Sequence, residues 1–242
     1  MKLSKGNLIA IFVILMLIID QIIKVIVKLN MTIGESISVF GNWFQILFIE
    51  NNGMAFGMQL GGIAGKLLLS GFRLVLIAVI IWYIIKLLKE DSLYKNKLDS
   101  TATNKGFLFK NLIPRKVPNG VLVGISLVLI GAIGNIVDSA FYGLIFSESD
   151  YTNVATLFPS NGGYAAFLCG KVVDMFYFPI INTTLPDWVP FWGGEEFVFF
   201  RPIFNFADSC VSVGVIYLLL FHRKFFGEHN TDKHKETASN VS

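Results

Sequence analysis

The sequence predicts an all-α membrane protein with four transmembrane helices, both termini cytoplasmic and a small extracytoplasmic β element. The first observation is composition: of 242 residues, 54% are hydrophobic and only 15% are charged, whereas soluble domains have about 25% charged residues. The second is that apolar residues come in separated blocks, and the third is that Lys and Arg gather in alternate loops. This pattern indicates a single integral membrane domain over residues 1–242.

Four segments approach the length of about 20 mainly apolar residues that a spanning helix needs. They are residues 7–28, 66–88, 119–138 and 203–222. The first follows Lys2 and Lys5 and has the look of a secretory signal peptide. No small-x-small cleavage site follows it, so an uncleaved helix is predicted. The apolar stretch 172–181 is too short to span.

The distribution of Lys and Arg predicts the orientation of these helices. Most of the 20 basic residues lie in the N-terminal tail, in and beside the loop 89–118, and in the tail 223–242. Cytoplasmic loops carry an excess of Lys and Arg, so these three regions are expected in the cytoplasm. The loops 29–65 and 139–202 are then expected to face outward.

The two outer loops differ in character. The first contains residues 36–40 and 44–49, whose β-branched and aromatic composition predicts strands. The second is long and rich in Phe, Gly and Pro, and it contains Trp188 and Trp192. Aromatic residues of this kind are typical of the headgroup level of a membrane.

Polar residues inside apolar segments are costly and therefore indicate function. They occur here as pairs spaced by three or four residues, a spacing that places both members on one helix face. Given the predicted orientation, every pair lies toward the outer leaflet, and Asp174 in the second outer loop can join them. The pairs are Asp20 with Lys24, Asn135 with Asp138, and Asn205 with Asp208.

Each polar group taken alone also has a simpler explanation. Asp20 and Lys24 form an intrahelical ion pair in this explanation, and Asn135 and Asp138 cap the end of a helix. Asp208 is stabilised by the helix dipole, and Asp174 is a surface residue. Arg73 is a snorkelling side chain. Independent groups have no reason to choose the same leaflet, so their convergence favours a common site.

Two carboxylates in a site of low dielectric do not both ionise readily, so one keeps a proton. The ionised carboxylate can then take a proton from water, and the neutral one can polarise a carbonyl, which is the chemistry of peptide hydrolysis. Motifs of serine hydrolases, zinc peptidases or phosphate-binding loops are absent from the sequence. The three His residues lie in the C-terminal tail and the two Cys are isolated, so neither a metal nor another cofactor is expected. The small net charge of +3 argues against a nucleic-acid partner.

Five short segments, in order along the chain, resemble the lipoprotein signal peptidase (signal peptidase II) family. They are Asp20-Gln21-Ile22-Ile23-Lys24, Asn51-Asn52-Gly53-Met54-Ala55-Phe56, Gly134-Asn135-Ile136-Val137-Asp138, Val172-Val173-Asp174 and Phe204-Asn205-Phe206-Ala207-Asp208. Each segment is weak alone. Together, on the predicted helices and the predicted side of the membrane, they are specific.

The resemblance implies an aspartic endopeptidase of the bacterial plasma (inner) membrane with its active site at the outer leaflet. Asp174 and Asp208 would be the catalytic pair. The substrate would be a prolipoprotein carrying a diacylglyceryl-cysteine, cleaved just before that cysteine, with membrane lipids as the surroundings. Separately from the resemblance, we expect the chain to be a monomer. Supporting or substrate-binding residues would be Asp20, Lys24, Asn51, Gly53, Asn135, Asp138 and Asn205.

The sequence departs from the family pattern in three ways. Ser139 stands where Arg usually follows the Gly-Asn-x-x-Asp segment, and Lys171 and Arg201 are the nearest basic residues in the outer loop that could replace it. Met175 stands where an aromatic residue is common. The chain is also longer than most members, through residues 89–118, 147–169 and 183–201, whose roles the sequence does not indicate.

Three other functions fit the sequence less well. A small proton-coupled carrier would use the intramembrane carboxylates as a relay, but it predicts polar groups spread through the membrane depth. A non-catalytic scaffold would bind an envelope partner through the aromatic outer loop. A divergent peptidase would accept other membrane-anchored precursors.

Overall fold

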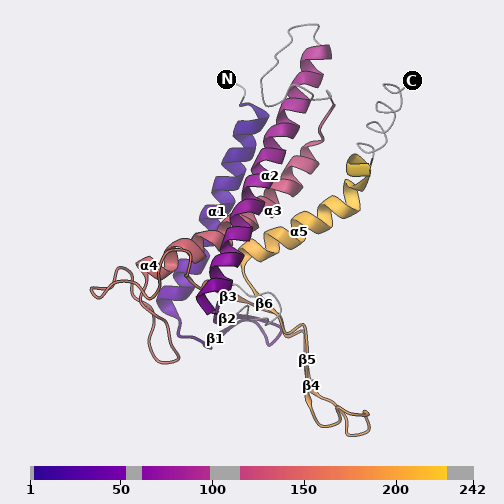
Figure 1. Cartoon of the computed structure of the whole chain (residues 1–242). Helices are drawn as coiled ribbons and strands as arrows, with labels where there is room; N and C mark the ends of the chain where they lie inside the picture. Colours follow the sequence, from indigo (N-terminus) through magenta and orange to yellow (C-terminus); the bar gives the residue numbers. More distant parts are fainter. Residues whose placement is uncertain (1–2, 53–61, 99–114, 228–242) are drawn as a thin grey trace.

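The structure, a computed structural model, describes residues 3–52, 62–98 and 115–227. Three helices run side by side: α1 (Lys5–Asn30), α2 (Gly62–Leu98) and α3 (Asn119–Val137) (Figure 1). The fourth, α5 (Phe206–Phe221), diverges from them (Figure 1). The start of α1 and the end of α5 lie at the same end of the bundle, and the β-strands gather at the other (Figure 1).

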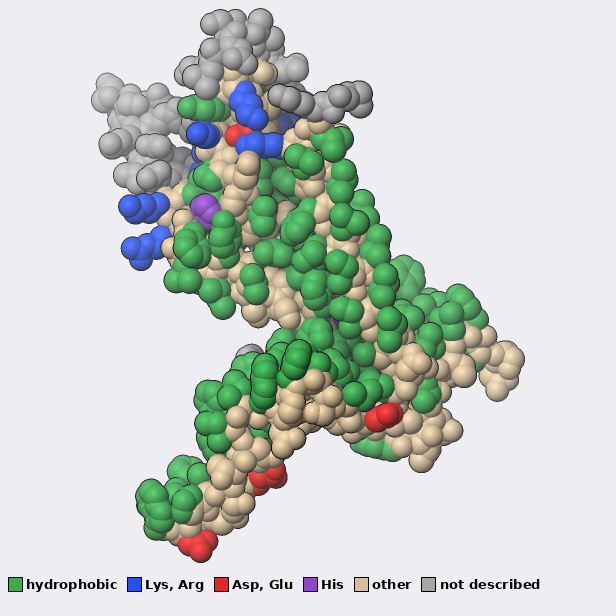
Figure 2. Space-filling view, turned by 180° about the vertical axis from the view of Figure 1, so that it is seen from behind, with side chains coloured by type: hydrophobic (Ala, Val, Ile, Leu, Met, Phe, Trp, Pro, Cys, Tyr) green, Lys and Arg blue, Asp and Glu red, His purple; other side chains and the backbone are tan. Residues whose placement is uncertain are grey.

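Three helical segments are long and apolar enough to cross a membrane, which confirms the first three expected apolar helices. They are Lys5–Asn30, Gly62–Asn96 and Asn119–Ile145. The first begins where the side chain of Ser4 accepts a hydrogen bond from the backbone N–H of Asn7, a normal helix N-cap. Hydrophobic side chains cover the middle of the bundle on the face in Figure 2, as expected of a surface that meets lipid.

The fourth helix is shorter than expected. It comprises 16 residues, fewer than the roughly 20 that a full span requires. The expected start at residue 203 was wrong, because Ile203–Phe204 pair with a strand as β6 and Asn205 is the N-cap. A membrane crossing by α5 stays a prediction.

The third helix does not end at Asp138, as the sequence predicted. It continues through a π-helical turn, η2 (Asp138–Tyr142), into the short α4 (Gly143–Ile145). Single π-turns inside helices often lie at functional sites, because the extra residue redirects side chains. Here the π-turn begins at one of the expected site residues.

The predicted β element is confirmed and is larger than expected. An antiparallel sheet has the strand order β1 (Ser36–Phe40), β2 (Phe44–Asn51), β3 (Val172–Tyr177), β6 (Ile203–Phe204). Asp174, expected in a loop, lies on β3 opposite Ile49 of β2. The sheet therefore joins the segment between α1 and α2 to the segment between α4 and α5, at the end of the bundle where α5 begins.

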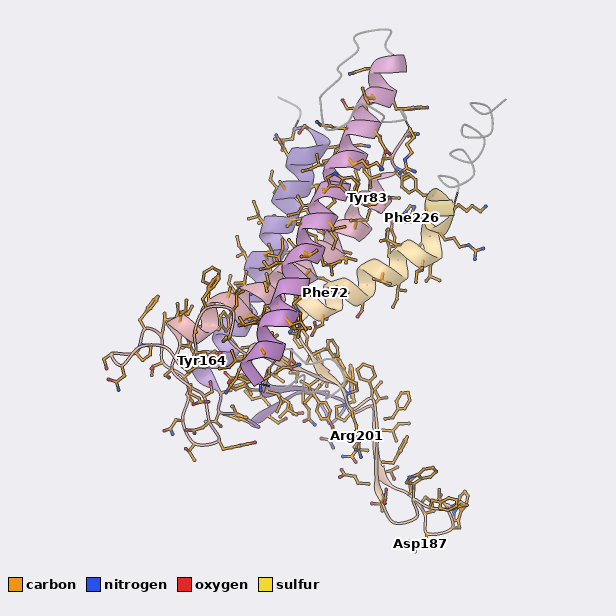
Figure 3. The ribbon with its side chains drawn as sticks, viewed as in Figure 1. Phe72, Tyr83, Tyr164, Asp187, Arg201 and Phe226 are labelled. Carbon is orange, nitrogen blue, oxygen red and sulfur yellow. The ribbon has the colours of Figure 1, made fainter. Side chains whose placement is uncertain are left out.

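A second pair of strands, β4 (Ile181–Thr184) and β5 (Glu196–Phe199), forms a hairpin that projects away from the bundle (Figures 1 and 3). Asp187 lies near its tip, with Trp188, Phe191 and Trp192 exposed beside it. Contact of these aromatic side chains with headgroups stays a prediction.

Close packing of α3 against α5 depends on glycines. A Cβ atom on Gly131 would lie 2.4 Å from the backbone oxygen of Ala207, and one on Gly214 would lie 2.7 Å from that of Gly124. Small residues allow the backbones of membrane helices to approach closely. This contact brings the N-terminal turn of α5 to the polar part of α3.

Candidate active site

Asp174 projects from β3 into a buried position where two amides hold its carboxylate. Its Oδ1 accepts a hydrogen bond of 2.7 Å from Nδ2 of Asn205, and its Oδ2 accepts one of 3.1 Å from Nδ2 of Asn51. Only 4% of the residue is exposed. Three segments that are distant in the sequence therefore meet at this carboxylate.

Asp208 lies in the first turn of α5 and forms a capping box with Asn205. The Asp208 backbone N–H donates to Oδ1 of Asn205 at 2.9 Å, and the Asn205 backbone N–H donates to Oδ2 of Asp208 at 3.3 Å. The remaining oxygen, Oδ1, accepts 2.8 Å from Nδ2 of Asn135. Asp208 is partly exposed, in contrast to Asp174. The simple helix-terminus explanation is therefore incomplete, since the same carboxylate also contacts α3.

Two asparagines connect the two aspartates. Nδ2 of Asn205 donates to Asp174 and also to Oδ1 of Asn135 at 3.1 Å. Asn135 in turn donates to Asp208. Each aspartate is thus linked to the other through side-chain amides whose orientation is fixed by at least two partners.

Lys24 places one buried positive charge behind this network. Its Nζ forms ion pairs with Asp138 at 2.8 Å and Asp20 at 3.1 Å, and it donates to Oδ1 of Asn135 at 3.0 Å. None of the three charged side chains is exposed. The pair of Asp20 and Lys24 is therefore more than an intrahelical contact, because it joins α1 to α3.

Asp20 and Asp138 hold the two segments that carry the aspartates. Oδ1 of Asp20 accepts the backbone N–H of Ala207 at 3.0 Å, next to Asp208. Oδ2 of Asp138 accepts the backbone N–H of Val173 at 3.2 Å, next to Asp174. These contacts orient the backbone on either side of the site.

Sequence reasoning missed Gln21 as a site residue, although it lies within the first family-like segment. Its Nε2 donates to Oδ2 of Asp20 and Oδ1 of Asp138, both at 3.0 Å. Its Oε1 accepts from the Tyr142 hydroxyl at 3.1 Å. The signal available was a polar residue next to Asp20 in an apolar segment.

The basic residues proposed to replace the family's arginine lie elsewhere. Lys171 forms ion pairs with Glu148 at 3.1 Å and Glu50 at 3.2 Å, and Glu50 also pairs with the buried Lys28. Arg201 is exposed and donates to the backbone oxygen of Glu196. Neither contacts Asp174 or Asp208.

The structure also places Ser139 and Met175, the two other positions that depart from the family pattern. The Ser139 hydroxyl donates to the backbone oxygen of Asn135, and Met175 is buried in the core cluster beside β2. Gly53 lies outside the described residues.

Burial, and after it the negative charge of Asp208, raise the pKa of Asp174 to about 7. The hydrogen bonds from Asn51 and Asn205 act in the opposite direction. Asp174 is therefore able to hold a proton near neutral pH beside a second, more accessible carboxylate. Across residues 3–52, 62–98 and 115–227, groups of three or more His, Cys, Asp or Glu arranged to hold a metal ion do not occur.

Comparison with known proteins places this arrangement in context. A solved structure described as a bacterial membrane enzyme, determined by the in meso method at 2.3 Å resolution, has a similar fold. Its TM-score is 0.50 and its sequence identity 22%, over 88% of this chain and 86% of that one.

Curated relatives are closer in sequence. A protein of Porphyromonas gingivalis named lipoprotein signal peptidase is 46% identical over 219 residues, covering 90% of this chain and 84% of the relative. A protein of Amoebophilus asiaticus with the same name is 35% identical, over 86% of this chain and 75% of that one. The family described as signal peptidase (SPase) II matches residues 12–224. With its several apolar helices, this multi-pass membrane protein belongs to the signal peptidase II family.

Proposed function

We propose that the chain is an aspartic endopeptidase that removes signal peptides from diacylglyceryl-modified prolipoproteins, cleaving just before the lipidated cysteine. Asp174 and Asp208 are the pair that activates water. The observation that carries the proposal is that Asn205 binds both residues while one carboxylate is buried and the other is accessible. Membership of a peptidase family favours this function over the carrier and scaffold alternatives.

The different surroundings of the two carboxylates suit opposite roles. Asp174, whose pKa is raised by burial, holds the proton and donates it toward the scissile carbonyl oxygen. The more accessible Asp208 acts as the base that takes a proton from water, whose oxygen attacks the carbonyl carbon. When the tetrahedral intermediate collapses, the C–N bond breaks and the leaving amine takes the proton from Asp208. Asp174 then regains its proton from the intermediate's hydroxyl group.

Several features support an active site at the outer leaflet of the bacterial plasma membrane. Lys and Arg side chains gather at the end of the bundle away from the strands (Figure 2), which is the pattern of a cytoplasmic side. Asp174 and Asp208 lie at the opposite end, where β3 meets the start of α5. The relatives' name, lipoprotein signal peptidase, supports a lipoprotein precursor as substrate.

The test is cleavage of a diacylglyceryl-modified prolipoprotein by the purified chain in detergent or lipid. We expect Asp174→Asn and Asp208→Asn each to lower kcat by about 100- to 10,000-fold, the range of general acid–base catalysis. Asp187→Asn, on the exposed hairpin tip, is the matched control and retains wild-type activity.

The substrate requires its own control. The same precursor without the diacylglyceryl group is expected to be cleaved poorly, because the lipid is part of what the site recognises. Turnover that survives either active-site substitution in a correctly folded variant would refute the two-aspartate mechanism.

A further inference from the structure

Arg73 of α2 has no role in the network described above, yet it lies on the face of α2 that packs inward. Residues separated alternately by four and three positions form one stripe along a helix. In α2 this stripe is Lys66, Ser70, Arg73, Ile77, Ile80, Ile84 and Leu87. Ile80, Ile84 and Leu87 are buried against α3, with Ile77 packed beside them.

The other end of the stripe also points into the protein. Lys66 donates to the backbone oxygen of Cys169 at 2.7 Å, and Ser70 donates to that of Leu168 at 3.2 Å. Both acceptors lie in the segment that leads into β3. Arg73 sits between these polar contacts and the apolar core, and its side chain is partly buried, whereas its neighbour Phe72 is exposed. In Figure 3, the label of Phe72 marks this turn of α2, at the level where α5 begins.

The carboxylates within electrostatic reach of the Arg73 guanidinium belong to the site: they are Asp208, Asp138 and Asp174. Within the described part of the chain, Arg73 makes neither a hydrogen bond nor an ion pair, so this attraction acts through space. Snorkelling toward the headgroups does not account for this placement, because Arg73 is partly buried and follows the packed stripe of α2.

Among the described ion pairs, Asp174 and Asp208 have no cationic partner, and Arg73 is suited to supply that positive charge. The charged groups of the site are Asp20 and Lys24 of α1, Asp138 of η2, Asp174 of β3 and Asp208 of α5. Lys24 is occupied by Asp20 and Asp138. The described hydrogen-bond donors to Asp174 and Asp208 are the neutral amides of Asn51, Asn135 and Asn205.

We propose that Arg73 is a positioning residue whose guanidinium faces the Asp174–Asp208 pair and stabilises its ionised form. The inference rests on the proposed peptidase function. Arginine suits this role because its charge persists at every pH at which the enzyme works and its planar guanidinium is weakly hydrated. The polar position 139, held by Ser139, carries no charge that could do the same.

The experiment is the pH dependence of kcat/KM for Arg73→Gln and Arg73→Lys, measured with the lipidated precursor. Removing a positive charge that faces the pair makes its ionised form harder to reach, so the acid limb moves to higher pH. For one charge near a partly solvated site we expect a shift of about one pH unit, hence about tenfold lower kcat/KM on that limb. Arg73→Lys keeps the charge and restores the profile.

A matched control removes an arginine from the same side of the protein. Arg201→Gln is the identical substitution at an exposed position, and it leaves the profile unchanged. Arg73→Met, an unbranched apolar side chain, gives a second charge-free variant in case glutamine impairs folding at a partly buried position.

The outcomes separate the two proposals. If Asp174→Asn and Asp208→Asn abolish cleavage while the Arg73→Gln profile superposes on that of wild type, the role of Arg73 is refuted and the aspartate mechanism stands. If Arg73→Lys is as impaired as Arg73→Gln, the shape of the side chain matters rather than its charge, and the inference is again wrong. If the wild-type chain never cleaves the precursor, the proposed function itself fails.

Discussion

Asn205 donates a hydrogen bond of 2.7 Å to Asp174 while its own side-chain oxygen caps the helix that carries Asp208. One buried side chain therefore sets the position of a strand residue and the start of a helix. Because both contacts use the same amide, a small displacement of α5 changes the geometry of the two aspartates together. The capping role uses Oδ1 of this amide and the positioning role uses Nδ2, so a substitution that keeps only an oxygen can separate the two roles.

Substitution of Asn205 is expected to divide stability from activity. Serine retains helix N-capping ability, whereas alanine loses it at a cost of about 1 kcal/mol. Neither side chain can donate to Asp174 as the amide does, so both variants should lose most activity. Thermal unfolding in detergent and precursor cleavage are measured side by side. Equal unfolding temperatures for Asn205→Ser and Asn205→Ala would contradict the capping role.

The pH dependence of activity should reflect the proton on Asp174. Its pKa is raised to about 7 by burial and the charge of Asp208, so the protonated form is lost as the pH rises through 7. If that form donates to the substrate carbonyl, kcat/KM for the free enzyme falls on the alkaline side of this value.

The charge of Asp208 can be tested as a cause of this shift. Asp208→Asn removes it but leaves Asp174 buried, so the pKa of Asp174 should fall while staying above its usual 3.8. Infrared titration of the protonated carboxyl band, assigned with Asp174→Asn, measures the change. A pKa that is the same with and without the Asp208 carboxylate would show that the two groups are not coupled.

Removal of Lys24 is expected to destabilise the protein strongly. Lys24→Met leaves Asp20 and Asp138 buried without their cation, a change that costs about 3–5 kcal/mol in comparable buried pairs. Lys5→Met is the control on the same helix, because the Lys5 side chain is partly exposed and its partner Asp91, although buried, keeps a second cation in Lys95; we expect a clearly smaller loss. Unfolding free energies that are similar for the two variants would argue against a structural role for the buried charges.

Gly134 should tolerate no side chain. A Cβ atom there would lie 2.7 Å from Oδ2 of Asp20 and 2.9 Å from Cβ of Ala207, so Gly134→Ala forces α1, α3 and α5 apart. We expect a loss of about 1–3 kcal/mol, as for other overpacked sites. A Cβ atom on Gly71 of α2 would meet nothing within 4 Å, so Gly71→Ala should be neutral or slightly stabilising. Thermal unfolding of the two variants checks this difference.

Much of the fold and the site could be predicted because the relevant signals are local. Apolar runs identified three helices, β-branched and aromatic composition identified β1 and β2, and the spacing of Asp20 and Lys24 placed them on one helix face. The composition of a segment and the period of a helix act over a few residues, so they can be read without knowing what the segment contacts.

Other features were decided only by the tertiary structure. The helix expected to end at Asp138 continues as η2, where Asp138 accepts a hydrogen bond from Val173 of β3. The helix expected from residue 203 begins at Phe206 because β6 pairs with β3. The sequence favours a snorkelling side chain for Arg73, and only the structure shows that its stripe packs against α3 and the segment before β3.

The sequence by itself determined which residues would be costly to bury, and the tertiary structure decided how they are paired. Lys24 and Asn135 are 111 positions apart, and Asn51 and Asp174 are 123 apart. A buried charge or amide is stable only where a partner meets it. Which partner does so depends on the packing of α3 against α5 and of β2 against β3, and local sequence does not encode that packing.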